Sequence, residues 1–175
     1  PVPLARLDAA LCEQADSVMP TRLLPPMTAA QTLAHWPRLD AAFAAAPLFH
    51  GAPAETGALA RHATLAGKSM PAAAATPATA TPPAIEVTLA ARVRARMADL
   101  FDAAGLGAAS ATSVAPGIGR AVVETARGLL MHEVVIERER VVDYTIVAPT
   151  EWNFHAGGVL PAGLVHSPCS AIAAI

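Results

Sequence analysis

Three segments in the second half of the chain alternate apolar and polar residues with a period of two. They are rich in β-branched residues, and short polar or glycine-containing joints separate them: Arg120–Thr125, Leu129–Glu137 and Val141–Val147. This period is typical of strands with one buried face, and short joints are typical of antiparallel neighbours. We therefore predict a three-stranded antiparallel meander over 120–147.

The preceding part of the chain shows the spacing of helices instead. Apolar residues recur every three or four positions over Leu4–Val18, Thr28–Ala46 and Ala84–Ala104, and the third of these patterns is the strongest. Pro37 weakens the middle of the second segment, which predicts that it forms two pieces. Gly105 fits the end of the third. The predicted fold class is α+β, with a helical N-terminal part followed by a small antiparallel meander.

Composition divides the chain into three parts. Residues 1–68 contain the first helices and a loop-like run at Pro47–Leu65, and the proline-rich, low-complexity run at 69–83 is typical of a linker or surface loop. Residues 84–175 contain the strongest helix, the meander and a tail too irregular for a prediction. We expect one incomplete domain that lacks its natural N-terminus, since the chain begins with Pro1.

Charge and hydropathy exclude several classes of protein. The formal net charge is -2, whereas electrostatic nucleic-acid binding needs clustered Lys and Arg. The sequence has neither an apolar run of about 18 residues for a membrane span nor the charged and apolar regions of a signal peptide. We expect a cytoplasmic protein that binds neither nucleic acid nor membrane. Its two cysteines, Cys12 and Cys169, are too few for a four-thiolate metal site and are expected to be reduced.

No familiar catalytic motif is present. The sequence contains no HExxH, no GxSxG and no P-loop. The glycine pair at Gly117–Gly119 precedes a predicted strand rather than a helix, which argues against a dinucleotide site.

Three short segments have both a structural and a functional interpretation. Arg127, at a strand joint before Gly128, fits a surface turn or a guanidinium presented to an anion. Thr150, after Pro149, fits a helix cap or a hydroxyl that points into a site. Cys169, in an apolar tail, fits buried packing or a metal ligand.

Five other residues receive a mainly structural interpretation. His132 is expected to pack or hydrogen-bond within its strand, and Tyr144 and Trp152 are expected to be core or half-core residues. Two alternatives stay open for Glu55 and Arg61: they form an ion pair with each other, or they contact and position the residues of a site.

Four motifs in a fixed order resemble the C-terminal part of nickel–iron hydrogenase large subunits. They are FHGAPAETGALAR (49–61), RGLLMH (127–132), DYTIVAPTEWNF (143–154) and SPCSAIAAI (167–175). The likeness covers about 47–175, interrupted by the low-complexity run. It implies the fold of that C-terminal part for this chain.

The departures from the hydrogenase pattern concern the nickel ligands. The resemblance places Ile172 where those enzymes have a second terminal cysteine, Ile175 where they have a histidine, and Ser167 where they have an aspartate. Nickel in such sites needs soft thiolate donors. We therefore expect no nickel and no hydrogen activation, which indicates a non-catalytic protein.

The resemblance also implies that this chain keeps residues which, in the hydrogenases, contact the iron of the active site and its cyanide ligands. By motif position, Arg127 and Thr150 match residues that hydrogen-bond the cyanides of the iron in the family, with Pro149 beside them, and Cys169 matches a metal-ligating thiolate. This combination resembles hydrogenase expression/formation proteins of the HupK/HoxV type. The resemblance implies a scaffold that transiently holds an Fe(CN)2(CO) fragment and works with hydrogenase maturation factors and the large subunit.

Two alternatives remain open at this point. The chain could be a fragment or variant of a catalytic nickel–iron hydrogenase large subunit, although Ile172 argues against it. It could also be a degenerate paralogue that serves as an interaction module, since likeness of fold does not fix function. Placement of Arg127, Thr150 and Cys169 on distant surfaces would favour this last reading.

Overall fold

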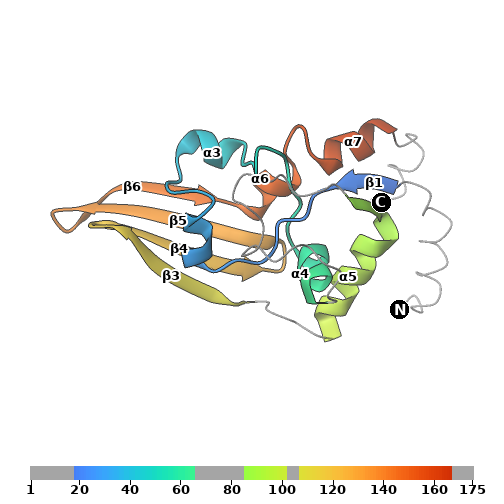
Figure 1. The fold of residues 1–175 in the computed structure, drawn as a ribbon, viewed down its shortest axis with the longest axis horizontal. Coiled ribbons are helices and arrows are strands. Elements are labelled where there is room, and N and C mark those ends of the chain that lie inside the picture. Colours follow the sequence, from blue (N-terminus) through green and yellow to red (C-terminus); the bar gives the residue numbers. More distant parts are fainter. Residues whose placement is uncertain (1–17, 66–84, 102–106, 167–175) are drawn as a thin grey trace.

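A four-stranded antiparallel sheet forms the larger part of the molecule. The computed structural model describes residues 18–65, 85–101 and 107–166. The strands lie side by side in chain order: β3 (Ala109–Ala115), β4 (Ile118–Thr125), β5 (Gly128–Glu137) and β6 (Arg140–Val147). The predicted meander is confirmed (Figure 1), and the α+β class with it. The additional strand, β3, was not predicted because its sequence ASATSVA has little contrast between apolar and polar positions.

One face of this sheet carries the core. Alternate residues of the central strands are buried, and short helices cover them: α2 (Ala29–Leu33), α3 (Ala41–Ala45) and α6 (Pro149–Asn153). Leu129, Met131 and Val147 pack there with an aromatic group that includes Trp36 and Trp152. Trp152 is 1% exposed, which confirms its predicted core position.

The predicted helix over 28–46 is two helices, as Pro37 indicated. Thr28 caps α2 and Asp40 caps α3, each by accepting a hydrogen bond from a backbone N–H three residues later. The chain between the two helices makes the turn that brings Trp36 into the core.

The helix predicted over Ala84–Ala104 begins later than expected. Residues 85–88 form strand β2 (Ile85–Thr88), and helix α5 (Leu89–Phe101) follows it directly. Strand β2 pairs with β1 (Val18–Thr21), with Val87 opposite Met19. Val18, predicted as the last residue of the first helix, is therefore in a strand. The β-branched residues of the sequence IEVT suit a strand, and pairing with β1 makes this segment a strand rather than the first turn of the helix.

Two further helices lie in segments for which no helix was predicted. Helix α4 (Ala58–Leu65) occupies the end of the expected loop at 47–65 and packs against α5, and α7 (Val159–His166) occupies part of the irregular tail. Within the described ranges, none of the helices combines the length and apolarity that a membrane crossing requires. The first predicted helix up to residue 17, the run at 69–83, Cys12 and Cys169 lie outside the described residues.

Candidate functional site

The first motif (49–61) and the second motif (127–132) meet at one glycine from each, Gly57 and Gly128. Gly57 and Gly128 adopt φ angles of +117° and +123°, a region that favours glycine. A Cβ on Gly128 would lie 2.4 Å from Thr56 Cγ2 and 2.8 Å from the Gly57 nitrogen. A Cβ on Gly57 would lie 3.0 Å from the carbonyl oxygen of Arg127. The two backbones therefore approach each other too closely for any side chain.

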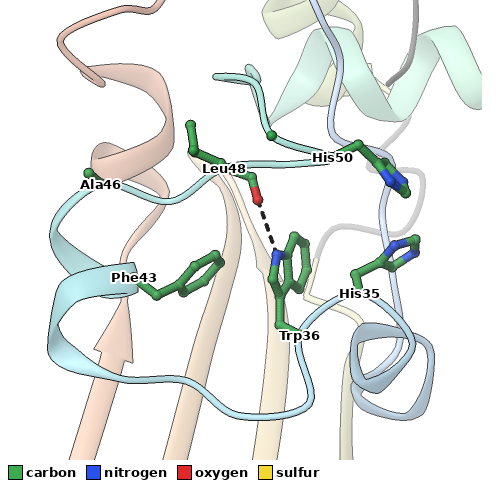
Figure 2. Close-up of a pocket in the computed structure, with 7 residues that line it drawn as sticks. His35, Trp36, Phe43, Ala46, Leu48 and His50 are labelled. Carbon is green, nitrogen blue, oxygen red and sulfur yellow. Dashed lines mark hydrogen bonds between the residues drawn. The ribbon is translucent and has the colours of Figure 1, made fainter. Parts of the chain in front are cut away.

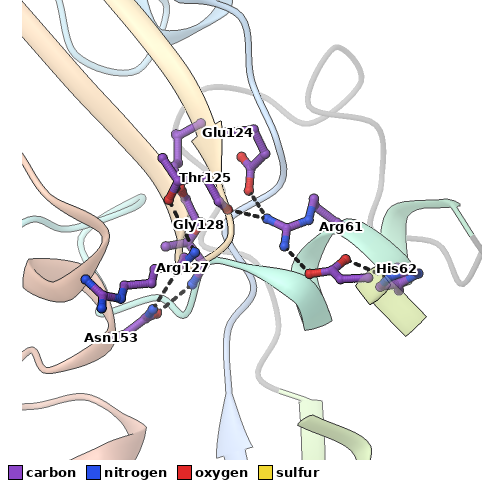
Figure 3. Close-up of polar contacts among 10 residues, drawn as sticks. Arg61, His62, Glu124, Thr125, Arg127, Gly128 and Asn153 are labelled. Atoms are coloured by element: carbon purple, nitrogen blue, oxygen red, sulfur yellow. Dashed lines mark hydrogen bonds and ion pairs between the residues drawn. The ribbon is translucent and has the colours of Figure 1, made fainter. Parts of the chain in front are cut away.

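Asn153 joins the third motif segment to the other two. Its Oδ1 accepts a hydrogen bond from the Thr56 backbone N–H at 2.9 Å, and its Nδ2 donates to the Arg127 carbonyl oxygen at 3.1 Å. A single amide side chain on α6 thus holds both glycine-containing segments (Figure 3). We refer to Thr56, Gly57, Arg127, Gly128 and Asn153 as the motif junction.

The turn that carries Arg127 is fixed on both sides. Thr125 Oγ1 accepts from the Arg127 N–H at 3.2 Å and donates to the Gly128 carbonyl at 2.8 Å. Thr56 Oγ1 accepts from the Leu129 N–H at 3.0 Å. Because these hydrogen bonds satisfy the backbone of the turn, the position from which the Arg127 side chain projects is well defined.

Arg61 binds the backbone of this turn through the Thr125 carbonyl. Its guanidinium donates to the Thr125 carbonyl at 2.9 Å, to Asp99 Oδ2 at 2.5 Å and to Glu124. Arg61 is 1% exposed. Of the two alternatives for Arg61, the supporting role agrees with these contacts.

Glu55 and Arg61 do not pair with each other. Glu55 instead binds Arg92 of α5, with Oε2 at 2.8 Å from Nη2, and accepts from the Thr21 hydroxyl at 3.2 Å. It thereby connects the segment before the motif junction to β1 and α5.

The two carboxylates on Arg61 have opposite pKa shifts. Burial raises the pKa of Glu124, and the bonds from Arg61 only partly oppose this effect. Burial would also raise the pKa of Asp99, but hydrogen bonds from Arg61 and His62 outweigh it and hold the pKa of Asp99 below its usual value. Asp99 Oδ1 lies 2.9 Å from His62 Nε2. Arg61 and His62 thus both stabilise the charged form of Asp99.

The predicted site residues have different environments. Arg127 is exposed, and among the described residues its guanidinium has no hydrogen-bond or ion-pair partner; Figure 3 shows it extending away from Arg61 on the side of Asn153. Pro149 is buried at the first position of α6, and Thr150 is half-buried one helical turn before Asn153. Cys169 lies outside the described residues, so its position relative to the others stays a prediction.

The residues that assemble the site were not predicted from the sequence. Thr56, Gly57, Gly128 and Asn153 all lie inside the quoted motifs, but no role was assigned to them. A glycine in each of two motifs could have indicated these positions, because glycine often marks a positive φ or a close approach of two backbones.

The prediction for Tyr144 was wrong, and that for His132 was right. Tyr144 is 55% exposed, because it lies on the face of the sheet opposite the core helices. Its hydroxyl is 2.7 Å from His132 Nδ1, and the two rings stack. His132 therefore has the structural role expected for a strand histidine. Across the described ranges, no group of three or more His, Cys, Asp or Glu side chains is arranged to hold a metal ion.

Comparison with known proteins identifies relatives by sequence. No family model and no solved structure matches the chain. The chain is 39% identical over 99 residues to a hydrogenase expression/formation protein HupK of Rhizobium leguminosarum bv. viciae, and 43% over 86 residues to a HupK of Bradyrhizobium diazoefficiens. It is 46% identical over 65 residues to a hydrogenase expression/formation protein HoxV of Cupriavidus necator.

The matches cover part of each protein. They include 47%, 43% and 32% of this chain, and 26%, 24% and 16% of the respective relatives. The chain thus aligns with about a quarter or less of the length of these curated relatives. At 39–46% identity over these stretches, it has curated homologues named as HupK and HoxV hydrogenase expression/formation proteins.

Proposed function

We propose that this chain acts in nickel–iron hydrogenase maturation as a non-catalytic scaffold that holds an Fe(CN)2(CO) fragment before its delivery to the large subunit. The names of the relatives support the maturation context. The observation that carries the finer proposal is the motif junction, where Asn153 joins the segment that carries Arg127 to the helix that carries Thr150.

Arg127 is the proposed contact for a cyanide. Its guanidinium is exposed, and it has no other partner among the described residues. A guanidinium remains charged at all relevant pH values and donates through a rigid fork of N–H groups. Donation from such a cation to an anionic cyanide nitrogen is a charge-assisted hydrogen bond, which is roughly twice as strong as a neutral one.

Thr150 is the proposed second contact. Pro149 occupies the first position of α6, where its fixed φ and missing N–H suit a helix start. Because Pro149 is buried, it fixes the first turn of α6 against the core, and Thr150 is the next residue of that turn. Because Asn153 of the same helix binds the Arg127 carbonyl, the two proposed donors belong to one connected unit.

Cys169 is the proposed thiolate for the iron. With Ile172 in place of a second cysteine, the terminal motif offers one thiolate. A single thiolate gives the weak anchoring that suits release of the fragment to an acceptor, and it lacks the set of soft donors that nickel needs. The donors and acceptors in this proposal are hydrogenase maturation factors and the hydrogenase large subunit.

Infrared spectroscopy tests the proposal. The chain is expressed together with the hydrogenase maturation factors, purified without oxygen, and examined for cyanide and carbonyl stretching bands. Loss of one hydrogen bond to a charged group costs about 1.5 to 3 kcal/mol, so Arg127→Ala is expected to lower the band intensity about tenfold or more. Thr150→Val and Cys169→Ser are expected to weaken the bands too.

Arg138→Ala is the matched control, because Arg138 is an exposed arginine on a different turn of the same sheet. This variant should retain the wild-type bands. Absence of bands in the wild-type chain, together with unchanged hydrogenase maturation in Arg127→Ala, would contradict the proposal.

A further inference from the structure

The four-stranded sheet has a second face, which points away from the core helices. On the core side, Trp36 and Phe43 cover the strands, and Trp36 Nε1 donates a hydrogen bond to the Leu48 carbonyl at 3.1 Å (Figure 2). On the opposite side, which we call the outer face, Tyr144 is 55% exposed and Ile146 is 45% exposed. Large apolar side chains of the sheet are therefore open to solvent there.

Two rows of side chains cross the outer face from β3 to β6, because directly paired residues of neighbouring strands share a face. None of the eight residues in these rows is Lys, Arg, Asp or Glu. The solvent-facing side of an antiparallel sheet is usually polar, so this composition is typical of a face that another surface covers. The first row contains Ala111, Ala121, His132 and Ile146, and the second contains Ser113, Gly119, Val134 and Tyr144.

The relief of the outer face is uneven. In both rows the residues on β3 and β4 are small, whereas those on β5 and β6 are large and form a ridge. The ridge is held together by the stacked rings of His132 and Tyr144, with the tyrosine hydroxyl 2.7 Å from His132 Nδ1. A hollow of about 430 Å³ lies beside the ridge, and its lining includes Ala111, Gly119 and Ala121. The outer face thus combines a ridge with a hollow of small residues.

We propose that the outer face binds the outer face of a second copy of this chain in a two-fold symmetric dimer. Sheets that pack face to face lie about 10 Å apart, with their strands aligned to within about 30°. A two-fold axis that runs along the strands between the sheets places β3 and β4 of one copy over β6 and β5 of the other. Each row then meets the same row of the other copy in reverse order, so that Ala121 faces His132 and Gly119 faces Val134.

Shape and charge both favour a second copy as the occupant. In the symmetric arrangement every position of the two rows pairs a small residue with a large one, so the ridge of each copy enters the hollow of the other. A two-fold axis across the strands would instead set ridge against ridge. Because the rows contain no acidic or basic residue, their burial removes no such charge from water, and a net charge of -2 gives little repulsion between copies.

The area of the outer face sets the expected strength of the dimer. Four strands about 4.8 Å apart and six residues at about 3.4 Å each make a face of roughly 20 by 20 Å, or about 400 Å² per copy measured flat. The relief of the side chains raises the total for two copies toward the roughly 1,000 Å² at which specific interfaces begin. Interfaces of this size are typical of weak complexes, so we expect a dissociation constant on the order of micromolar.

Sedimentation velocity at protein concentrations from about 1 to 200 µM tests the proposal. The wild-type chain should shift from monomer to dimer within this range. Ala121→Lys places a charge in the hollow, twice in each interface because of the symmetry, and should raise the dissociation constant about tenfold or more. Tyr144→Ser removes part of the ridge and should have an effect in the same direction. Because Tyr144 is more than half exposed on an edge strand, this variant keeps the core intact.

Ala45→Lys is the matched control, because it makes the same substitution at an exposed residue of α3 on the core side of the sheet. This variant should dimerise like the wild type, and urea unfolding of all the variants checks that each is folded. A wild-type chain that stays monomeric throughout the range would overturn the proposal and leave another protein, or another part of this chain, to cover the outer face. Dissociation constants of Ala121→Lys and Tyr144→Ser within about twofold of that of Ala45→Lys would also overturn it, since the dimer would then use a different surface.

Discussion

Gly128 shows how strongly a single position can depend on a distant segment. The residue combines a positive φ with a neighbour from another motif inside the space that a Cβ would fill. Either feature alone favours glycine, and together they leave no alternative without movement of the Thr56 segment.

We predict that Gly128→Ala lowers the free energy of unfolding by about 2 to 4 kcal/mol. The unfavourable φ and the overlap with Thr56 each cost about 1 to 3 kcal/mol. Equilibrium unfolding in urea measures the change. Gly107→Ala is the control, because Gly107 has a φ of +79° but nothing within 4 Å of an added Cβ. It should cost only about 1 kcal/mol; equal losses in the two variants would show that the contact with Thr56 has no effect.

At the scale of elements, the short helices depend on their caps and on the sheet. Helix α2 has five residues, far fewer than a helix needs to persist alone. Thr28 and Gln31 form a reciprocal capping box, in which Gln31 Oε1 accepts from the Thr28 N–H at 2.8 Å. The Ala29 N–H donates to Ser110 Oγ of β3 at 2.7 Å, which ties the helix start to the sheet.

We predict that Thr28→Ala lowers the free energy of unfolding by about 1 kcal/mol, because the first turn of α2 loses its side-chain acceptor. Chemical denaturation of the two proteins under identical conditions measures the difference. Thr28→Ser keeps a hydroxyl in the same place and should remain within a few tenths of a kcal/mol of the wild type. A serine variant as unstable as the alanine variant would argue against the cap.

At the scale of the whole molecule, buried charges connect the sheet to its covering helices. Glu133 is 2% exposed and binds Arg120 of β4 at 2.5 Å and Arg38, between α2 and α3, at 2.6 Å. Arg120 also donates to the Trp36 carbonyl at 2.6 Å. Glu133 and Arg120 are buried, whereas the Arg38 side chain is half-exposed. Removal of either Glu133 or Arg120 therefore leaves the other as an uncompensated charge in the core.

Three carboxylates with shifted pKa values, Glu133, Asp99 and Glu124, make the stability of the fold depend on pH. Burial would raise the pKa of Glu133, but hydrogen bonds from Arg120, Arg38 and the Leu39 N–H hold it below its usual value. The stabilisation from Glu133 is thus present above the pKa of the unfolded chain and is lost as pH falls through the lower folded value; Asp99 behaves in the same way. The pKa of Glu124 is raised, so its contribution has the opposite sign and is lost as pH rises.

We predict that Glu133→Gln loses about 3 kcal/mol or more at neutral pH and shows a weaker pH dependence on the acid side. Unfolding in urea between about pH 3 and pH 7 measures both effects. Glu137→Gln, an exposed position on the same strand, should follow the wild-type curve. A Glu133→Gln curve parallel to that of the wild type would mean that this carboxyl does not govern the acid limb.

Much of the sheet could be predicted because strand periodicity is a local property. Buried and less buried residues alternate along β4 and through most of β5, as the pattern predicts, whereas the first five residues of β6 are all exposed. Alternation does not predict β3, where small residues hide it, or β2, where pairing with β1 decides the conformation. Tyr144 was misplaced because alternation alone does not say which face of a sheet is covered.

The sequence alone is enough to predict strands β4, β5 and β6, the division of the helical region near Pro37 and the order of the motifs, since these depend on neighbouring residues. The contacts among Thr56, Arg127 and Asn153, and the neighbouring positions of His35 and His50, exist only in the folded chain. Residues far apart in the chain come together only when the whole core packs. Contacts between distant segments depend on backbone approach and burial, which no local pattern encodes.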